Sequence, residues 1–290
     1  MSLLAFALVV LAAFIHATWN LLAKRAAHAG PAFVFTYTGV ACTAYLPWVA
    51  WLIGSEAVSW SGAGMACIVV SGALHLAYSL CLQRGYQVAD LSVVYPVARG
   101  SGPLLATIGA LVLLGERPGI VGIAGLLAVV TGIVLISTQG RLSRFADPAS
   151  RKGVHWGTTT GAAIAGYTVV DAYGIKMLGI QPVVLDWCAN VVRLAMLLPW
   201  FLANRRDAMA RMRGHWGLAI AVGVLSPLSY ILVLSALRLG APLSLTAPAR
   251  EMSMMVGALL GAWILKESVG WGRLSGCLVM IVGVALLASA

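Results

Sequence analysis

The chain has 290 residues, of which 61% are hydrophobic and only 10% are charged, and its mean hydropathy is +0.94. A soluble core does not need this much apolar sequence, so we predict an all-α, polytopic membrane protein. The net charge of +10 does not indicate a nucleic-acid partner, because most basic residues lie in short turns between apolar runs. The 5 cysteines are scattered without metal-ligand spacing, so we expect no metal site, no disulfide framework and no cofactor.

The apolar runs predict ten membrane-spanning helices, separated by turns rich in glycine and proline. We place these helices at 3–23, 31–53, 61–83, 90–114, 119–138, 153–175, 181–203, 214–237, 241–264 and 270–288. One sizeable polar segment divides the chain near its middle. It predicts a first domain over residues 1–138, a cytoplasmic linker over 139–152 and a second domain over 153–290.

The distribution of lysine and arginine between alternate turns predicts the orientation in the membrane. One side collects Lys24, Arg25, Arg84, Arg141, Arg144, Arg151, Lys152, Arg205, Arg206, Arg211, Arg213, Lys266 and Arg273. The other side collects only Arg117, Lys176 and Arg238. Because cytoplasmic loops carry the excess of basic residues, we expect the first side to be cytoplasmic. Both termini then lie outside, and the membrane is the inner (cytoplasmic) one.

Residues 62–114 predict two helices joined by a short turn at 85–90, and they carry polar side chains deep in the apolar sequence. Tyr78 and Tyr95 are about equally far from the turn, and so are His75 and Arg99. In an antiparallel helix pair this spacing predicts two tiers at matching depths. Ionisable groups near the bilayer midplane are costly unless they face a wet cavity, so the four residues mark a candidate substrate site. We expect the second helix to be interrupted around them, at Pro96, Gly100, Gly102 and Pro103.

The two halves of the chain repeat at an offset of 151 to 152 residues. The matches are Lys24 with Lys176, Pro31 with Pro182, Pro47-Trp48 with Pro199-Trp200, Gly72 with Gly223, Ala98-Arg99 with Ala249-Arg250, Glu116 with Glu267, and Gly125 and Gly132 with Gly276 and Gly283. Five spans per repeat is an odd number, so the second copy must be inserted upside down. Inverted repeats are typical of alternating-access transporters, whose substrate site lies between the two copies.

Each repeat closes with a helix, a Gly-Glu or Lys-Glu turn and a glycine-rich helix, over 98–132 and 249–283. This pattern resembles the drug/metabolite transporter superfamily and its EamA-type ten-helix members. The resemblance implies two inverted five-helix repeats around a central cavity, with the fifth helix of each repeat at the periphery. The aromatic residues are further similar to those of the YddG-like exporters of aromatic amino acids. Unlike the small multidrug members, the first span has no carboxylate and carries His16, Trp19 and Asn20 instead.

Each candidate site residue also has a structural interpretation. His75 is a candidate to bind substrate and to carry a coupling proton, or it is a packing residue bonded to a neighbouring helix. Arg99 and Arg250, equivalent in the two repeats, are candidates to bind a substrate carboxylate. The alternatives for both are a structural ion pair and a side chain that extends to the membrane interface. The carboxylates available for such a pair, which are also coupling candidates, are Glu251, Asp171 and Asp186.

Aromatic and polar residues in other spans extend the candidate site. Tyr78, Tyr95 and Trp19 offer flat apolar faces with a polar edge, although rings near span ends also belong to the headgroup belt. Tyr167 interrupts the small-residue sixth span. The seventh span carries Asp186, Asn190 and Arg193 at i, i+4 and i+7, which indicates either a cavity wall or interhelical hydrogen bonds.

Small residues and prolines indicate how the helices pack and bend. The glycines of the fifth and tenth spans predict close helix packing; they are Gly122, Gly125, Gly132, Gly276 and Gly283. We expect helix bends at Pro47, Pro199, Pro227 and Pro248.

These observations favour a secondary transporter that exports amino acids, aromatic ones favoured, or similar small metabolites by alternating access. The substrate would stack on Tyr78 and Tyr95 and present its carboxylate to an arginine. The alternatives are a lipid or multidrug flippase of the same architecture and an intramembrane enzyme. The enzyme is disfavoured because the sequence holds no Asp-x-x-Asp grouping and no Gly-x-Ser-Gly motif. The expected partners are a small-molecule substrate, the lipid bilayer and coupling protons, and we expect a monomer.

Overall fold

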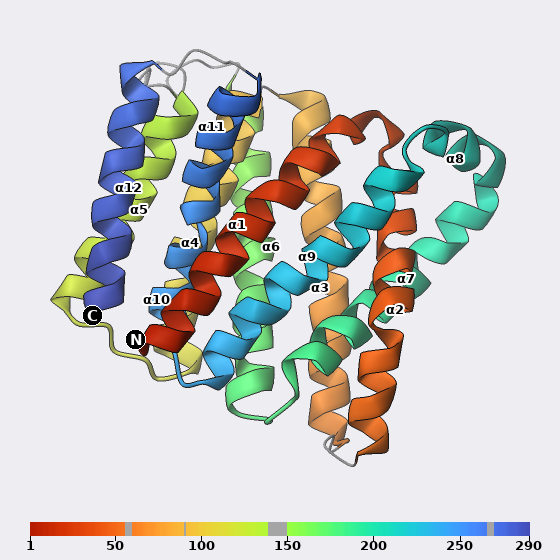
Figure 1. Ribbon diagram of the computed structural model, residues 1–290, viewed down its shortest axis with the longest axis horizontal. Coiled ribbons are helices and arrows are strands. Elements are labelled where there is room, and N and C mark those ends of the chain that lie inside the picture. The colour runs from red at the N-terminus through yellow and green to blue at the C-terminus, as the bar shows by residue number, and fades with distance from the viewer. Residues whose placement is uncertain (56–59, 90, 139–149, 266–269) are drawn as a thin grey trace.

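The structure, a computed structural model, describes residues 1–55, 60–89, 91–138, 150–265 and 270–290. These ranges contain helices and turns but no strand (Figure 1). The helices are α1 (Leu3–Arg25), η1 (Ala27–Ala29), α2 (Pro31–Gly54), α3 (Gly62–Val88), α4 (Leu91–Leu113), α5 (Ile120–Thr138), α6 (Arg151–Lys176), α7 (Pro182–Ala203), α8 (Arg205–Met212), α9 (Trp216–Arg238), α10 (Leu243–Arg250), α11 (Met252–Leu265) and α12 (Trp271–Ser289).

Eight of the described helices are long and apolar enough to cross a membrane: α1, α2, α3, α4, α5, α7, α9 and α12. This confirms a multi-pass, all-helical membrane protein. Of the others, α6 has 26 residues but is more polar, whereas α10 with 8 and α11 with 14 are each too short alone. The predicted spans coincide with these helices to within a few residues, except that the ninth span covers both α10 and α11.

The segment 62–114 differs from its prediction in two respects. α3 continues to Val88 and α4 begins at Leu91, so the connection is shorter than predicted. Gly85 lies inside α3, where an added Cβ would stand 2.8 Å from a side chain of α4. The expected interruption of the second helix is wrong, because α4 is one continuous helix that contains both Pro96 and Pro103.

The break falls in the second half of the chain instead, at Glu251 between α10 and α11. The N–H of Glu251 donates to the carbonyl of Pro248 at 3.0 Å, and the N–H of Met254 donates to the carbonyl of Glu251 at 2.9 Å. Both are i to i−3 bonds, which tighten the helix locally. Pro248 contributes to the break because it has no N–H to donate to the preceding turn.

α5 and α12 pack side by side and run antiparallel at one edge of the bundle (Figure 1). An added Cβ at Gly132 would stand 2.8 Å from the carbonyl oxygen of Gly276, and one at Gly125 would stand 3.0 Å from that of Gly283. Backbone therefore meets backbone along the crossing, which confirms the packing role predicted for these glycines.

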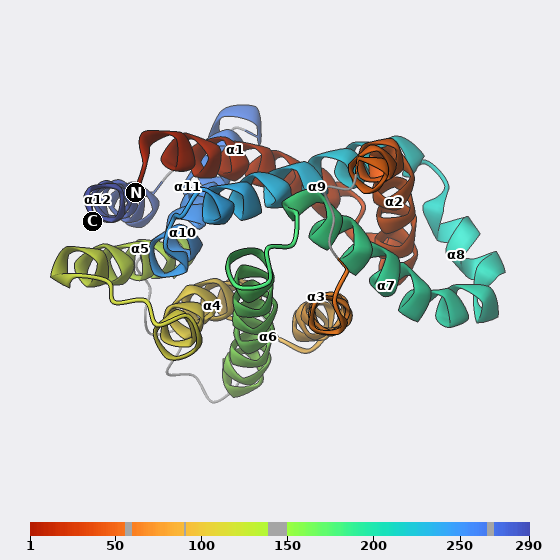
Figure 2. The same cartoon turned by 90° about the horizontal axis from the view of Figure 1, so that it is seen from below.

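α2 and α7 form a second antiparallel pair. Phe35 near the start of α2 stacks on Phe201 near the end of α7, with ring centroids 4.1 Å apart. At the other end, Val49 shares an apolar cluster with Val183 and Val184. Between the two pairs, α6 lies between α3 and α4, and α1 lies along α9 (Figure 2).

Candidate functional site

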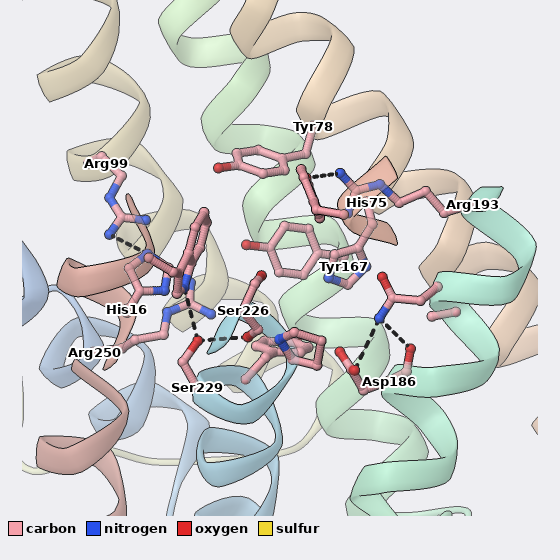
Figure 3. A pocket seen from close by; sticks show the side chains of 16 residues that line it. His16, His75, Tyr78, Arg99, Tyr167, Asp186, Arg193, Ser226, Ser229 and Arg250 are labelled. Atoms are coloured by element: carbon pink, nitrogen blue, oxygen red, sulfur yellow. Dashed lines mark hydrogen bonds between the residues drawn. The ribbon is translucent and has the colours of Figure 1, made fainter. Parts of the chain in front are cut away.

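A cavity lies between helices of both halves of the chain (Figure 3). The first half contributes His16, Trp19, Tyr37, His75, Tyr78 and Arg99. The second half contributes Tyr167, Asp186, Ala189, Asn190, Arg193, Ser226, Pro227, Ser229, Tyr230 and Arg250. Rings, hydroxyls and charges dominate this lining, and such groups are stable at membrane depth only when they face protein or water.

Tyr167 of α6 is the centre of a cluster of rings in the cavity wall. His75 stacks on it with centroids 3.9 Å apart, Tyr78 meets it edge-on at 5.8 Å, and Tyr230 at 6.0 Å. The His75 ring is also fixed on its own helix, because its Nδ1 lies 3.0 Å from the carbonyl oxygen of Ser71. The cluster forms a rigid wall of π-faces with hydroxyl edges.

The helix pair predicted for 62–114 is therefore split by a third helix, since α6 packs against both α3 and α4 (Figure 2). His75 and Tyr78 contact Tyr167 of that helix. The ring of Tyr95 is not part of the cavity lining; it lies 5.9 Å from Cζ of Arg99 and packs against the apolar cluster behind it.

Arg99 is tied into the protein by several contacts, although it lines the cavity. Its Nε lies 2.8 Å from Oε2 of Glu251, and its Nη2 donates to the hydroxyl of Ser253 at 3.1 Å. The same Nη2 lies 3.4 Å from Nε2 of His16 on α1. Of the alternatives for this arginine, the structure contains the ion pair with Glu251, which joins α4 to the break between α10 and α11.

Arg250 lines the same cavity with far fewer contacts. Its Nη2 lies 3.8 Å from Oε1 of Glu251, the carboxylate already engaged by Arg99. Its Cζ lies 6.0 Å from the ring centroid of Tyr230. In the part of the chain that the structure describes, Arg250 donates no hydrogen bond, and its buried Nε has no partner.

The polar face of α7 forms both a cavity wall and interhelical bonds. Asn190 donates to Oδ2 of Asp186 at 3.1 Å. Arg193 donates to the hydroxyls of Tyr37 on α2 at 2.6 Å and Ser79 on α3 at 2.9 Å. Asp186, by contrast, has no lysine or arginine nitrogen within 4.0 Å among the described residues.

Of the remaining candidate site residues, one lines the cavity and two lie behind the residues that line it. Trp19 lines the cavity and donates its indole N–H to the hydroxyl of Ser229 at 3.2 Å. Asp171 is fully buried outside the lining and accepts a hydrogen bond from the hydroxyl of Tyr230. Glu251 is also outside the lining, and both of its basic neighbours are arginines.

Sequence reasoning missed Tyr37 on α2 and Tyr230, Ser226 and Ser229 on α9. Tyr230 lies one helical turn from Pro227. That proline indicated a bend in the helix, but it did not indicate that the neighbouring side chains line a cavity. No sequence feature marked Tyr37, because a single tyrosine in an apolar span is equally typical of helix packing and of the aromatic belt at the lipid headgroups.

The model of the EamA-like transporter family matches the chain over residues 3–138 and 151–289. A solved crystal structure of a protein aligns over 98% of this chain and 97% of its own, with a TM-score of 0.74 and 15% sequence identity. At that identity the likeness shows the fold alone. A comparison with curated proteins finds no significant match.

Proposed function

Because the chain belongs to the EamA-like transporter family, we propose that it is a secondary transporter that exports amino acids, aromatic ones favoured, or similar small amphipathic metabolites. Family membership makes it a membrane transporter of the drug/metabolite type rather than an enzyme. The finer proposal depends on one observation, a cavity shared by both halves in which aromatic rings lie between side chains of opposite charge (Figure 3).

The two signs of charge in the cavity support an amino acid as the substrate. Arg250 and Asp186 both line it, and neither has a close, exclusive ion-pair partner among the described residues. Buried charges are stable when they are paired, and an amino acid supplies one charge of each sign. The faces of Tyr78 and Tyr167 suit an aromatic side chain. A lipid tail or a hydrocarbon-like drug would leave the charges unpaired.

The packing of α5 against α12 supports an inverted repeat. These helices are equivalent in the two halves, and they run antiparallel. Equivalent helices in opposite directions require one half to be upside down relative to the other. The contact between Gly125 and Gly283 becomes the contact between Gly276 and Gly132 when the two halves are exchanged. A twofold relation through this crossing accounts for both contacts.

A second set of contacts supports the same twofold relation. An added Cβ at Gly72 on α3 would meet Val192 on α7 at 2.8 Å, and one at Gly223 on α9 would meet Val40 on α2 at 2.7 Å. Gly72 matches Gly223, and Val40 matches Val192, in the sequence repeat. Inverted repeats are the architecture that alternating access uses, with the two halves rocking about a shared site.

We further propose ten membrane crossings, in which α6 forms one and α10 with α11 forms another. Both termini lie at the same end of the bundle (Figure 1), and Arg25 lies at the far end of α1. We place the turns rich in lysine and arginine in the cytoplasm, so both termini lie on the opposite, non-cytoplasmic side of the inner membrane. The domains we propose are 1–138 and 153–290, joined by a cytoplasmic linker at 139–152, and the two ranges of the family match support this division.

In this proposal the substrate contacts His75, Tyr78 and Trp19, and its carboxylate binds an arginine. Tyr95 lies outside the cavity lining, with its ring beside the guanidinium group of Arg99. The groups available for proton coupling are His75, Asp171, Asp186 and Glu251. The transporter acts as a monomer, with the lipid bilayer and protons as its other partners.

The test is counterflow in proteoliposomes over the common amino acids, with and without a pH gradient. Saturable exchange that Tyr78→Ala and His75→Ala abolish would support the proposal. Tyr173→Ala is the matched control, because Tyr173 on α6 is 42% exposed and outside the lining. Ion current, lipid scrambling or full activity in Tyr78→Ala, His75→Ala and Arg99→Ala together would reject it.

A further inference from the structure

The two arginines at equivalent repeat positions have unequal surroundings. Arg99 is 6% exposed and Arg250 is 4% exposed, so water does little to stabilise either charge. Arg99 has a carboxylate at 2.8 Å and a hydroxyl acceptor at 3.1 Å. Among the described residues, the ion-pair partner of Arg250 is the more distant oxygen of the same carboxylate, at 3.8 Å. One carboxylate therefore serves two buried guanidinium groups, and it lies much closer to Arg99.

The sequence repeat explains the inequality. The carboxylate and hydroxyl partners of Arg99 are Glu251 and Ser253, both from the second half. At the offset of 151 that relates the two arginines, the equivalent positions in the first half are Gly100 and Gly102. Glycine has no side chain, so the twofold relation gives Arg250 no counterpart of either partner.

Arg250 also faces the cavity, and it donates no hydrogen bond to the residues that the structure describes. It is part of the lining together with Ser229 and Tyr230, and Figure 3 shows it beside His16 at one side of the cavity. Its Nε is buried and makes no hydrogen bond to a described residue; the Nε of Arg99 makes none either, but it lies 2.8 Å from a carboxylate oxygen of Glu251. A guanidinium has a fixed fork of donors that fits a carboxylate with two parallel hydrogen bonds. The missing acceptor has the chemistry of a ligand carboxylate.

We propose that Arg250 alone is the carboxylate anchor of the substrate site, and that Arg99 is a positioning residue that holds Glu251 and the α10–α11 break. This inference rests on the proposed function, because it assumes a substrate with a free carboxylate. It makes the duplicated arginines unequal. Repeat 2 binds the acid, and repeat 1 uses its arginine for structure.

The assignment predicts the effect of Glu251 on binding. Glu251 competes with the substrate carboxylate for Arg250, so its removal should leave the preference for acids intact or increase it. In Arg99→Gln alone, Glu251 becomes free to pair with Arg250 and should weaken acid binding. Tests of the two arginines therefore need the Glu251→Gln background.

The experiment compares two double variants of the purified full chain, Arg99→Gln/Glu251→Gln and Arg250→Gln/Glu251→Gln. The probes are L-phenylalanine and L-phenylalaninamide, which differ in the carboxylate. Binding is measured by calorimetry in detergent. The wild type should prefer the acid by about tenfold or more, as expected for charge-assisted hydrogen bonds. The first double variant should keep that preference, and the second should lose it.

Single lysine variants give a second readout if a double variant does not fold. Arg250→Lys keeps the charge but loses the fork, so the acid preference should fall, whereas Arg99→Lys should leave the preference unchanged. The inference is overturned if Arg250→Gln/Glu251→Gln retains the preference, if Arg99→Lys is the variant that loses it, or if the wild type binds acid and amide equally. Absence of amino-acid counterflow altogether rejects the proposed function, which is a separate result.

Discussion

The carboxylate of Glu116 lies 2.7 Å from the ammonium of Lys176, and it also caps the start of α10. Oε1 accepts the N–H of Leu243 at 2.7 Å, and Oε2 accepts both the N–H of Ser244 at 2.8 Å and its hydroxyl at 2.7 Å. The first N–H groups of a helix have no partner within the helix. One side chain from the α4–α5 connection therefore joins the end of α6 to the start of α10.

Glu116→Gln should destabilise the protein by about 2 kcal/mol, because the amide removes the ion pair and presents an N–H₂ to the helix donors. The measurement is thermal unfolding of purified protein in detergent. Asp207→Asn is the matched control. Its ion pair with Arg211 has the same kind of geometry at 2.8 Å, but both side chains are more than half exposed. Exposed pairs contribute about 0.5 kcal/mol or less, so equal losses in the two variants would contradict the prediction.

The same carboxylate should make part of the stability depend on pH. Burial alone would raise the pKa of Glu116, but hydrogen bonds from Lys176, Ser244 and Leu243 together hold that pKa below its ordinary value. A carboxyl whose pKa is lowered in the folded state contributes stability above its unfolded pKa and loses it as the pH falls through the folded pKa.

The difference in melting temperature between wild type and Glu116→Gln should therefore be constant near neutrality. It should shrink as the pH falls below about 4, the ordinary range of a glutamate. A difference that stays the same from neutral to strongly acidic pH would contradict this account of the carboxylate.

The helices could be predicted from sequence because the bilayer sets their length and polarity. The predicted span 31–53 corresponds to α2 (Pro31–Gly54) in the structure, and the predicted span 181–203 corresponds to α7 (Pro182–Ala203). A bend was predicted at Pro248, and the break lies close to it, at Glu251; that this proline accompanies a break could not be predicted, because α4, which has two prolines, stays continuous. A helix break depends on whether neighbouring groups satisfy the freed backbone, which lies outside the local sequence.

The site could be predicted in kind but not in detail. Intramembrane His75 and Arg250 were recognisable because ionisable residues at that depth are rare. The partners of the charged residues could not be predicted in the same way. The repeat aligns Glu116 with Glu267, but this match does not reveal that Glu116 binds the start of α10. Glu267 lies outside the described residues. Which face of α9 carries Tyr230 into the cavity depends on how α9 packs against α1, α2 and α6, which only the assembled bundle determines.

Glu251→Gln should be more destabilising than Arg99→Gln. The glutamate side chain is 1% exposed and is the carboxylate within 4.0 Å of both Arg99 and Arg250. Its neutralisation leaves two buried arginines without a counter-charge, at a cost of about 3–5 kcal/mol. Arg99→Gln costs less, because Arg250 can still neutralise Glu251. Unfolding of the two variants in detergent under increasing denaturant checks the order, and a larger loss in Arg99→Gln would contradict it.

Gly132→Ala should destabilise the contact between α5 and α12. The new Cβ would stand 2.8 Å from the carbonyl oxygen of Gly276 and 3.0 Å from Cβ of Met280, so the helices must move apart. Overpacking of this kind costs about 1–3 kcal/mol. Gly217→Ala on α9 is the matched control, because an added Cβ there meets nothing within 4 Å and helix propensity should add up to about 1 kcal/mol. Melting temperatures in detergent should therefore move in opposite directions. A neutral Gly132→Ala would contradict close backbone contact between α5 and α12 at this crossing.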